Sequence, residues 1–196
     1  MTLTILFGSL SSVIAFVSFW PYLKDIIARK TTPHMYSWLV WTILQMMAVI
    51  AILRENAFWS ALGVAVAGLV SLSVFLLSFK YGTKNVTLFD SICLGGAFAA
   101  IAVWIFANDV LLSIVLITLI DFIGFLPTYR KGYEEPHSET LFLYVCSAFS
   151  NIFALLSITQ YSIESSLYVT SLIVSNVMFV GIVLMRRHKL SKALGI

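Results

Sequence analysis

The stretch that decides the fold is Phe19-Trp-Pro21-Tyr-Leu-Lys24, followed closely by Pro33-His34-Met-Tyr-Ser37. It recurs about half a chain later as Phe125-Leu-Pro127-Thr-Tyr-Arg130, followed by Pro136-His137-Ser-Glu-Thr140. Both copies hold a Pro-x-x-basic element and then a Pro-His-x-x-hydroxyl element, which indicates an internal duplication. In a hydrophobic chain, a duplicated membrane unit is typical of a carrier whose solute site lies between the two halves.

The composition around this repeat is that of an integral membrane protein. Of the 196 residues, 60% are hydrophobic and 11% are charged, and the mean hydropathy is +0.99. Soluble domains carry about a quarter charged residues. Windows of about 20 apolar residues, long enough to cross a hydrocarbon core of about 30 Å, predict seven transmembrane helices. They cover residues 2–20, 36–53, 58–79, 88–107, 110–129, 140–158 and 166–185.

The positions of the basic residues predict the orientation, because short cytoplasmic loops collect Lys and Arg. Basic residues follow the first, third, fifth and seventh spans, and only Arg54 falls on the other side. We therefore expect a multi-pass protein of the inner (cytoplasmic) membrane, with the N-terminus outside and the C-terminus in the cytoplasm. The net charge of +3 reflects this topology and gives no support for a nucleic-acid partner.

The repeat and the topology together predict an all-α fold in a 3+1+3 arrangement. Residues 1–84 form a first triple-helix bundle, residues 85–108 a linker helix, and residues 109–196 a second triple-helix bundle of the same membrane domain. The single linker helix reverses the chain direction once. Spans one to three and five to seven therefore run the same way, which makes a parallel repeat.

The chain resembles the SWEET and PQ-loop (MtN3) superfamily in its full-length seven-helix form. It is most similar to uncharacterised bacterial members in Pro21-Tyr-Leu-Lys-Asp25, Lys30-Thr-Thr-Pro-His34, Ser37-Trp38 and Ser138-Glu-Thr140. The resemblance implies alternating access, a polar solute held near the bilayer middle, and helices that bend at Pro21 and Pro127. The chain departs from the PQ-loop pattern where Tyr22 and Thr128 replace the glutamine after the proline, and from SWEET proteins in lacking prolines within spans two and six.

Two of the four prolines, Pro21 and Pro127, allow two interpretations. They are hinges or gates, since a proline removes one backbone hydrogen bond and loosens a turn, or they simply end their helices. Pro33 is expected at the first position of the second helix, with Thr32 as its N-cap. His34 and His137 are then expected in interfacial first turns.

Asp121 is the outstanding polar residue within a span. It lies about eleven residues into the fifth span, near the middle of the membrane at a rise of about 1.5 Å per residue, with no basic residue expected at that depth. A polar group in lipid must face a partner or a cavity. Asp121 is therefore either a proton-coupling or solute-binding group, or a neutral acid hydrogen-bonded to a serine or a carbonyl. The repeat offset pairs it with Ala15, which makes the site asymmetric.

Other candidate solute-binding residues lie at similar depth. Deep amides bind hydroxyl or amide groups well, but they also join helices. Trp41 and Tyr144 correspond through the repeat and can stack on a flat solute or block a gate, whereas the neighbouring Trp38 better suits an interfacial aromatic belt. The full set of candidates for binding or coupling is Gln45, Trp41, Asp121, Tyr144, Ser147, Asn151 and Asn176.

These features predict a membrane transporter of a small polar solute such as a sugar, nucleoside, vitamin or amino acid, with facilitated and proton-coupled transport both left open. An anionic solute is disfavoured because the deep charge is acidic. The alternative is a receptor or assembly factor of the same architecture that binds a ligand without moving it. We expect no enzyme activity, no cofactor, no metal site and no disulfide between Cys93 and Cys146. The expected partners are the solute and membrane lipid, and the oligomeric state stays open.

Overall fold

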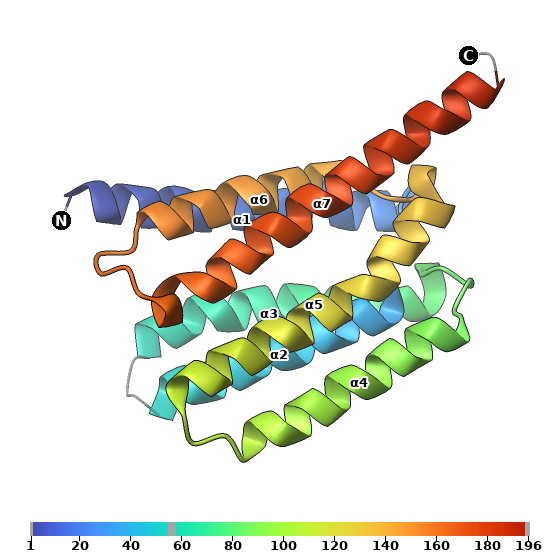
Figure 1. Ribbon diagram of the computed structural model, residues 1–196. Coiled ribbons are helices and arrows are strands. Elements are labelled where there is room, and N and C mark those ends of the chain that lie inside the picture. The colour runs from blue at the N-terminus through green and yellow to red at the C-terminus, as the bar shows by residue number, and fades with distance from the viewer. Residues whose placement is uncertain (1, 55–57, 195–196) are drawn as a thin grey trace.

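The structure is a computed structural model, and it describes residues 2–54 and 58–194. These residues form seven α-helices and one short 3-10 helix, with no β-strand among them. In chain order they are α1 Thr2–Ile27, α2 Met35–Arg54, α3 Phe58–Tyr81, α4 Leu88–Ile105, α5 Val110–Glu134, the 3-10 helix η1 Pro136–Ser138, α6 Leu141–Leu156 and α7 Ile163–Leu194. Successive α-helices run in opposite directions, so the odd-numbered helices point one way and the even-numbered helices the other (Figure 1).

The chain is a multi-pass membrane protein, since five helices of the described part are long and apolar enough to cross a membrane. These are Leu3–Ile27, Val64–Tyr81, Leu88–Ile105, Val110–Glu134 and Ser165–Ala193. The other two helices contribute the shorter apolar stretches Met35–Ile50 and Leu141–Leu156. Three helices extend at least five residues past their predicted spans: α1, α5 and α7 end at Ile27, Glu134 and Leu194, beyond the expected ends at 20, 129 and 185.

The first proline of each repeat lies inside a helix. α1 continues from Pro21 to Ile27 and α5 continues from Pro127 to Glu134, so the interpretation that these prolines end their helices is wrong. Figure 1 shows α5 changing direction in its C-terminal third, the part that contains Pro127. Such a change of direction is the usual effect of a proline, which removes a backbone hydrogen bond and clashes with the preceding turn.

The segment before α2 differs from the prediction. α2 begins at Met35, so Thr32 is not its N-cap and Pro33 is not its first residue. The backbone of this segment instead pairs with two other loops: the Thr32 amide donates to the Ser138 carbonyl at 3.0 Å, and the Thr83 amide donates to the Pro33 carbonyl at 3.1 Å. These bonds satisfy buried backbone groups without helix formation. Three loops are thereby joined at one end of the molecule.

The helices of the two repeats pack against each other. α1 packs against α6, α2 packs against both α3 and α5, and α7 packs against α5 and α6. α4 lies mainly against α5, where Ala97 and Ile101 meet Val40, Leu44 and Ile120 in a buried apolar cluster. Outward-facing side chains are apolar as well, as helices in lipid require. Phe16 of α1 and Val177 of α7, for example, are 65% and 56% exposed.

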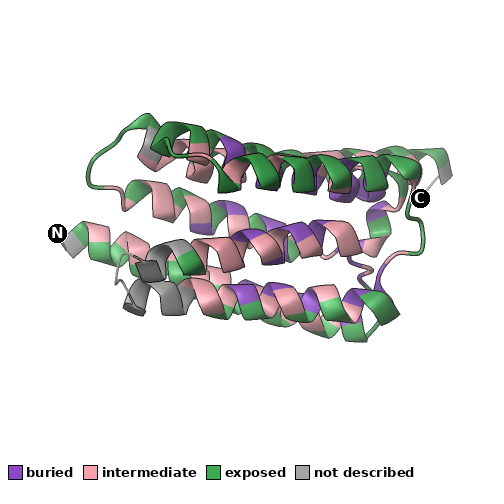
Figure 2. Ribbon diagram, turned by 90° about the horizontal axis from the view of Figure 1, so that it is seen from below, coloured by how far each residue is buried: buried purple, intermediate pink, exposed green. Residues whose placement is uncertain are grey.

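The two ends of the molecule differ in charge and in packing. The basic end comprises the C-terminal ends of α1, α3, α5 and α7 with loops 28–34, 82–87 and 135–140, and the opposite end holds loops 106–109 and 157–162. Eleven of the twelve Lys and Arg residues lie at the basic end. Figure 2 shows buried residues concentrated toward the basic end, while partly buried residues are more common toward the other.

Candidate functional site

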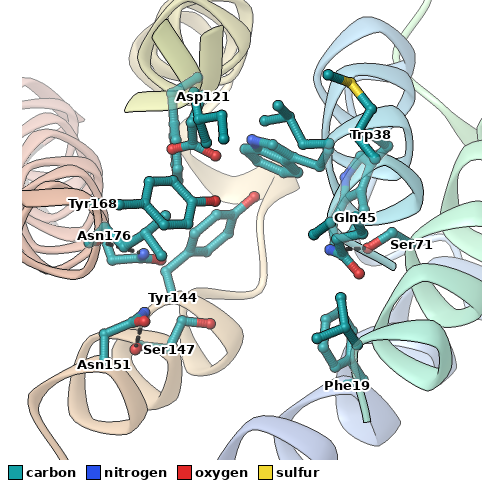
Figure 3. A pocket seen from close by; sticks show the side chains of 18 of the residues that line it. Phe19, Trp38, Gln45, Ser71, Asp121, Tyr144, Ser147, Asn151, Tyr168 and Asn176 are labelled. Atoms are coloured by element: carbon teal, nitrogen blue, oxygen red, sulfur yellow. Dashed lines mark hydrogen bonds between the residues drawn. The ribbon is translucent and has the colours of Figure 1, made fainter. Parts of the chain in front are cut away.

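A cavity of about 470 Å³ lies between the helices of the first repeat and those of the second. Side chains of α1, α2 and α3 line one side, and side chains of α5, α6 and α7 line the other (Figure 3). The cavity extends toward the opposite end, where Val64, Trp104 and Tyr168 line it. Small-molecule sites typically measure about 300–1,000 Å³, so the cavity suits a small solute.

All seven residues predicted to bind or couple a solute line this one cavity. α2 supplies two of them, α5 one, α6 three and α7 one; they are Trp41, Gln45, Asp121, Tyr144, Ser147, Asn151 and Asn176. Pro21 and Pro127, the predicted hinges, are not among the lining residues. Each lies two positions beyond a lining residue, Phe19 and Phe125 respectively. The structure therefore brings the polar candidates together, and their roles stay predictions.

Asp121 lies at the middle of α5 with its side chain against the cavity. The residue is 3% exposed, and its carboxylate has no hydrogen bond or ion pair within the described part of the chain. In Figure 3 it points into the cavity beside Tyr168 of α7. A structural acid held by a serine or a carbonyl would show such a bond, so the geometry favours a carboxylate that is free to meet a ligand.

The amide side chains around the cavity use their nitrogens as donors to neighbouring protein groups. Asn151 Nδ2 donates to the Ser147 carbonyl at 2.8 Å, and Asn176 Nδ2 donates to the Leu172 carbonyl at 2.8 Å. Because a carbonyl only accepts, these bonds fix which amide atom is the donor. Gln45 Nε2 likewise donates to Ser71 Oγ at 2.9 Å, and Gln45 Oε1 is buried without a partner. Each of the three amides therefore keeps its oxygen and one N–H for a ligand.

An aromatic layer closes the cavity toward the basic end. Trp41 contacts Phe125 at 4.7 Å between ring centroids, Trp38 contacts Trp41 at 5.0 Å, and Tyr144 contacts Phe179 at 4.2 Å. Trp38 is only 3% exposed, so its assignment to an interfacial belt is wrong. The first turn of α2 is covered by Phe19 and Tyr22 of α1, which the sequence could not place beside it.

Beyond the aromatic layer lies a buried ion pair that sequence reasoning missed. Lys131 Nζ donates to Glu139 Oε1 at 2.9 Å and to the Ser138 carbonyl at 2.9 Å, and the two side chains are 0% and 1% exposed. The Tyr22 hydroxyl donates to Glu139 Oε2 at 3.4 Å. Burial raises the pKa of Glu139, and the Lys131 ammonium opposes that rise. The pair ties α5 to the segment before α6 and reaches α1.

A second buried cluster holds His34, which was expected in an interfacial first turn and is instead fully buried. Its Nε2 lies 3.4 Å from Asp90 Oδ2, and Arg130 donates to both Asp90 oxygens at 2.9 and 2.7 Å. Burial lowers the pKa of His34 to about 4, although Asp90 pulls it upward. The imidazole is therefore neutral at neutral pH. Its repeat counterpart His137 is exposed, so the two histidines occupy different environments.

Asp90 is fixed by local geometry as well. Its Oδ2 accepts the Thr87 amide at 2.7 Å, and Thr87 caps α4 through the Asp90 amide, which makes a capping box. The Thr87-x-x-Asp90 pattern is a sequence signal that could have indicated this helix start. No comparable signal exists for the contact with Arg130, which comes from 40 residues later in the chain. Tyr168 and Trp104 also line the cavity and were not among the predicted residues. Both are aromatic residues near the end of a span, and that position gives no indication of an inward orientation.

Among the residues described, no group of three His, Cys, Asp or Glu side chains could hold a metal ion. The chain matches no known family model, no curated protein and no solved structure. The site is therefore interpreted from its own chemistry: one unpaired carboxylate, a set of hydrogen-bond acceptors, and aromatic walls.

Proposed function

We propose that this protein is a SWEET-like carrier that moves a small polar solute by alternating access. In this proposal all seven helices span the cytoplasmic membrane in a 3+1+3 arrangement, with the N-terminus outside and the C-terminus in the cytoplasm. The alternating helix directions and the concentration of Lys and Arg at the basic end support this topology.

The observation that carries the proposal is the central cavity with Asp121 in its wall. The cavity lies between the two copies of a repeat, where carriers of this type hold their solute. An intramembrane acid without a partner is a functional group by default, because a merely structural role would supply a partner. Size, position and chemistry thus agree with a solute site.

The basic end has the features of a closed gate. The aromatic layer lies next to the cavity, and the Lys131–Glu139 pair and the His34–Asp90–Arg130 cluster lie behind it. Opening at this end requires the end of α1 to separate from the segment before α6. It also requires the end of α5 to separate from loop 28–34. Pro21 and Pro127 lie between the cavity and these ends, where a helix that lacks a backbone hydrogen bond bends most easily.

Counterflow in proteoliposomes tests the proposal. Vesicles containing purified protein are preloaded with one unlabelled solute, and uptake of its labelled form is followed for sugars, nucleosides, amino acids and amines. We expect saturable uptake for one class. Asp121→Asn should reduce that uptake about tenfold or more, since loss of one buried charge contact costs more than about 1.4 kcal/mol.

The matched control is Asp109→Asn, at the N-cap of the same helix. Asp109 is exposed and caps α5 by accepting the Leu112 amide at 2.7 Å, a role that asparagine also performs. This variant should transport normally. Absence of uptake for every class by folded wild-type protein would contradict a carrier and favour the receptor or assembly role.

A further inference from the structure

We propose that the solute of this cavity is a small organic ammonium ion with an apolar body and no acidic group. This inference rests on the proposed function, because it assigns a substrate class to the same cavity. It derives from the charge, the hydrogen-bonding groups and the ring surfaces that line the cavity.

The charge of the cavity is the first argument. Asp121 is the acidic residue among the lining residues that the structure describes, and none of these is Lys, Arg or His. The nearest cations along α5 are Arg130 and Lys131, about nine and ten residues away, or roughly 15 Å at 1.5 Å per residue. Both are already paired, Arg130 with Asp90 and Glu134, and Lys131 with Glu139. A counter-ion for Asp121 must therefore come from the ligand or from a proton.

The hydrogen-bonding groups are the second argument. Gln45 Oε1 has no hydrogen-bond partner among the described residues, and each of the Asn151 and Asn176 side chains keeps its oxygen and one N–H for a ligand, since one N–H is already bonded. A protonated amine has several N–H donors and no acceptor, which complements these oxygens. Trp104 Nε1, a donor without a partner among the described residues, lies toward the opposite end. Three more such donors, Trp38 Nε1, Trp41 Nε1 and the Tyr144 hydroxyl, lie at the aromatic layer. They suit a neutral acceptor such as a hydroxyl at the far end of the ligand.

Charge balance decides between an amine and an amino acid. An ammonium ion beside Asp121 leaves the cavity neutral, whereas a zwitterion leaves one uncompensated negative charge. A buried unpaired charge is strongly unfavourable, and no lining residue supplies a cation for a carboxylate. A neutral sugar leaves Asp121 itself unpaired. The monocation is the ligand class that satisfies the site without a further proton.

The walls are the third argument. Aromatic side chains from α1, α2, α5, α6 and α7 line the cavity, namely Phe19, Trp41, Phe125, Tyr144 and Tyr168. Ring faces attract cations within about 6 Å and pack against apolar groups. In Figure 3, Tyr168 and Tyr144 reach into the cavity on the side of Asp121. These rings hold the body of the ligand while the carboxylate holds its ammonium group.

Binding of three probes that share a phenylethyl group tests the inference. The probes are 2-phenylethylamine, its neutral analogue 2-phenylethanol, and phenylalanine, which adds a carboxylate to the amine. Purified protein in detergent is titrated with each, and tryptophan fluorescence is recorded, since Trp38, Trp41 and Trp104 line the cavity. We expect saturable binding of the amine, at least tenfold tighter than that of the alcohol or of phenylalanine.

The variants Asp121→Asn and Asp109→Asn complete the test. Asp121→Asn should lose the preference for the amine over the alcohol, and Asp109→Asn should keep it. Equal binding of the alcohol or of phenylalanine, retention of the preference by Asp121→Asn, or no binding of the amine would each overturn the inference. If Asp121→Asn does not fold, the three probes on wild-type protein decide. Counterflow decides the carrier proposal separately, because amine binding without flux refutes transport alone.

Discussion

At the scale of single residues, the polar residues that line the cavity were predicted from the sequence, whereas the buried surroundings of His34 and Lys131 were not. Gln45, Asp121, Asn151 and Asn176 were found because polar side chains in lipid must face the protein interior, and all four line the cavity. His34 was misplaced, since its burial depends on Asp90 and Arg130 from distant segments. Lys131 was placed after the fifth span, and its burial in α5 depends on Glu139, which follows the next turn.

The buried His34 makes stability depend on pH. Its pKa in the folded protein is about 4, whereas an unfolded chain binds the proton near 6.5. Between these values the unfolded state takes up more protons, so stability falls as pH falls. From pH 7 to pH 5, this one group should lower the free energy of unfolding by about 2 kcal/mol. Thermal unfolding midpoints in detergent at the two pH values measure the effect.

The matched variants are His34→Gln and His137→Gln, at the corresponding positions of the repeat. The His34 variant should lose most of the pH dependence, and the variant of the exposed His137 should keep it. The account fails if both variants respond to pH as the wild type does.

At the scale of helices, the sequence predicted existence and direction but not length or packing. Apolar windows located all seven helices, but α1, α5 and α7 continue past the predicted span ends at 20, 129 and 185. Helices extend beyond the hydrocarbon core wherever neighbouring segments cover their ends. At the basic end, Arg187 of α7 donates to the Pro136 and Glu139 carbonyls at 2.9 Å each and so anchors α7 to the segment before α6. A hydropathy window cannot detect such contacts.

Packing of α5 on α7 depends on Gly132. A Cβ atom at this position would lie 2.5 Å from Phe179 Cε2 and 3.0 Å from Val183 Cγ2. Phe179 is fully buried against Tyr144 and Tyr129, so its ring has no space to move. Gly132→Ala should therefore lower stability by about 1–3 kcal/mol, the usual cost of overpacking, measured by the midpoint of thermal unfolding.

Gly95→Ala and Gly181→Ala are the controls, since an added Cβ meets nothing within 4 Å at either helical position. Alanine is favoured over glycine in helices by about 1 kcal/mol. These two variants should unfold at the wild-type temperature or above. A Gly132→Ala variant as stable as they are would show that α5 and α7 do not pack as described.

At the scale of the whole molecule, the position of the cavity agrees with the duplication that the sequence predicts. Helices α1, α2 and α3 supply one wall and α5, α6 and α7 the other, and three loops are joined at the basic end. The repeat was recognisable in the sequence because its two short elements, Pro-x-x-basic and Pro-His-x-x-hydroxyl, recur in the same order. The asymmetry between copies was only partly visible: Ala15 opposite Asp121 was predicted, and the different environments of His34 and His137 were not.

Access to the cavity from both sides of the membrane is the central claim. In a background without Cys93 and Cys146, Ser147→Cys places one thiol in the cavity wall. Sealed vesicles of known orientation are treated with a membrane-impermeant thiol reagent from one side and, separately, from the other. A carrier predicts labelling from both sides, slowed in each case by bound solute. Labelling from one side only, with and without solute, would contradict alternating access and leave a receptor.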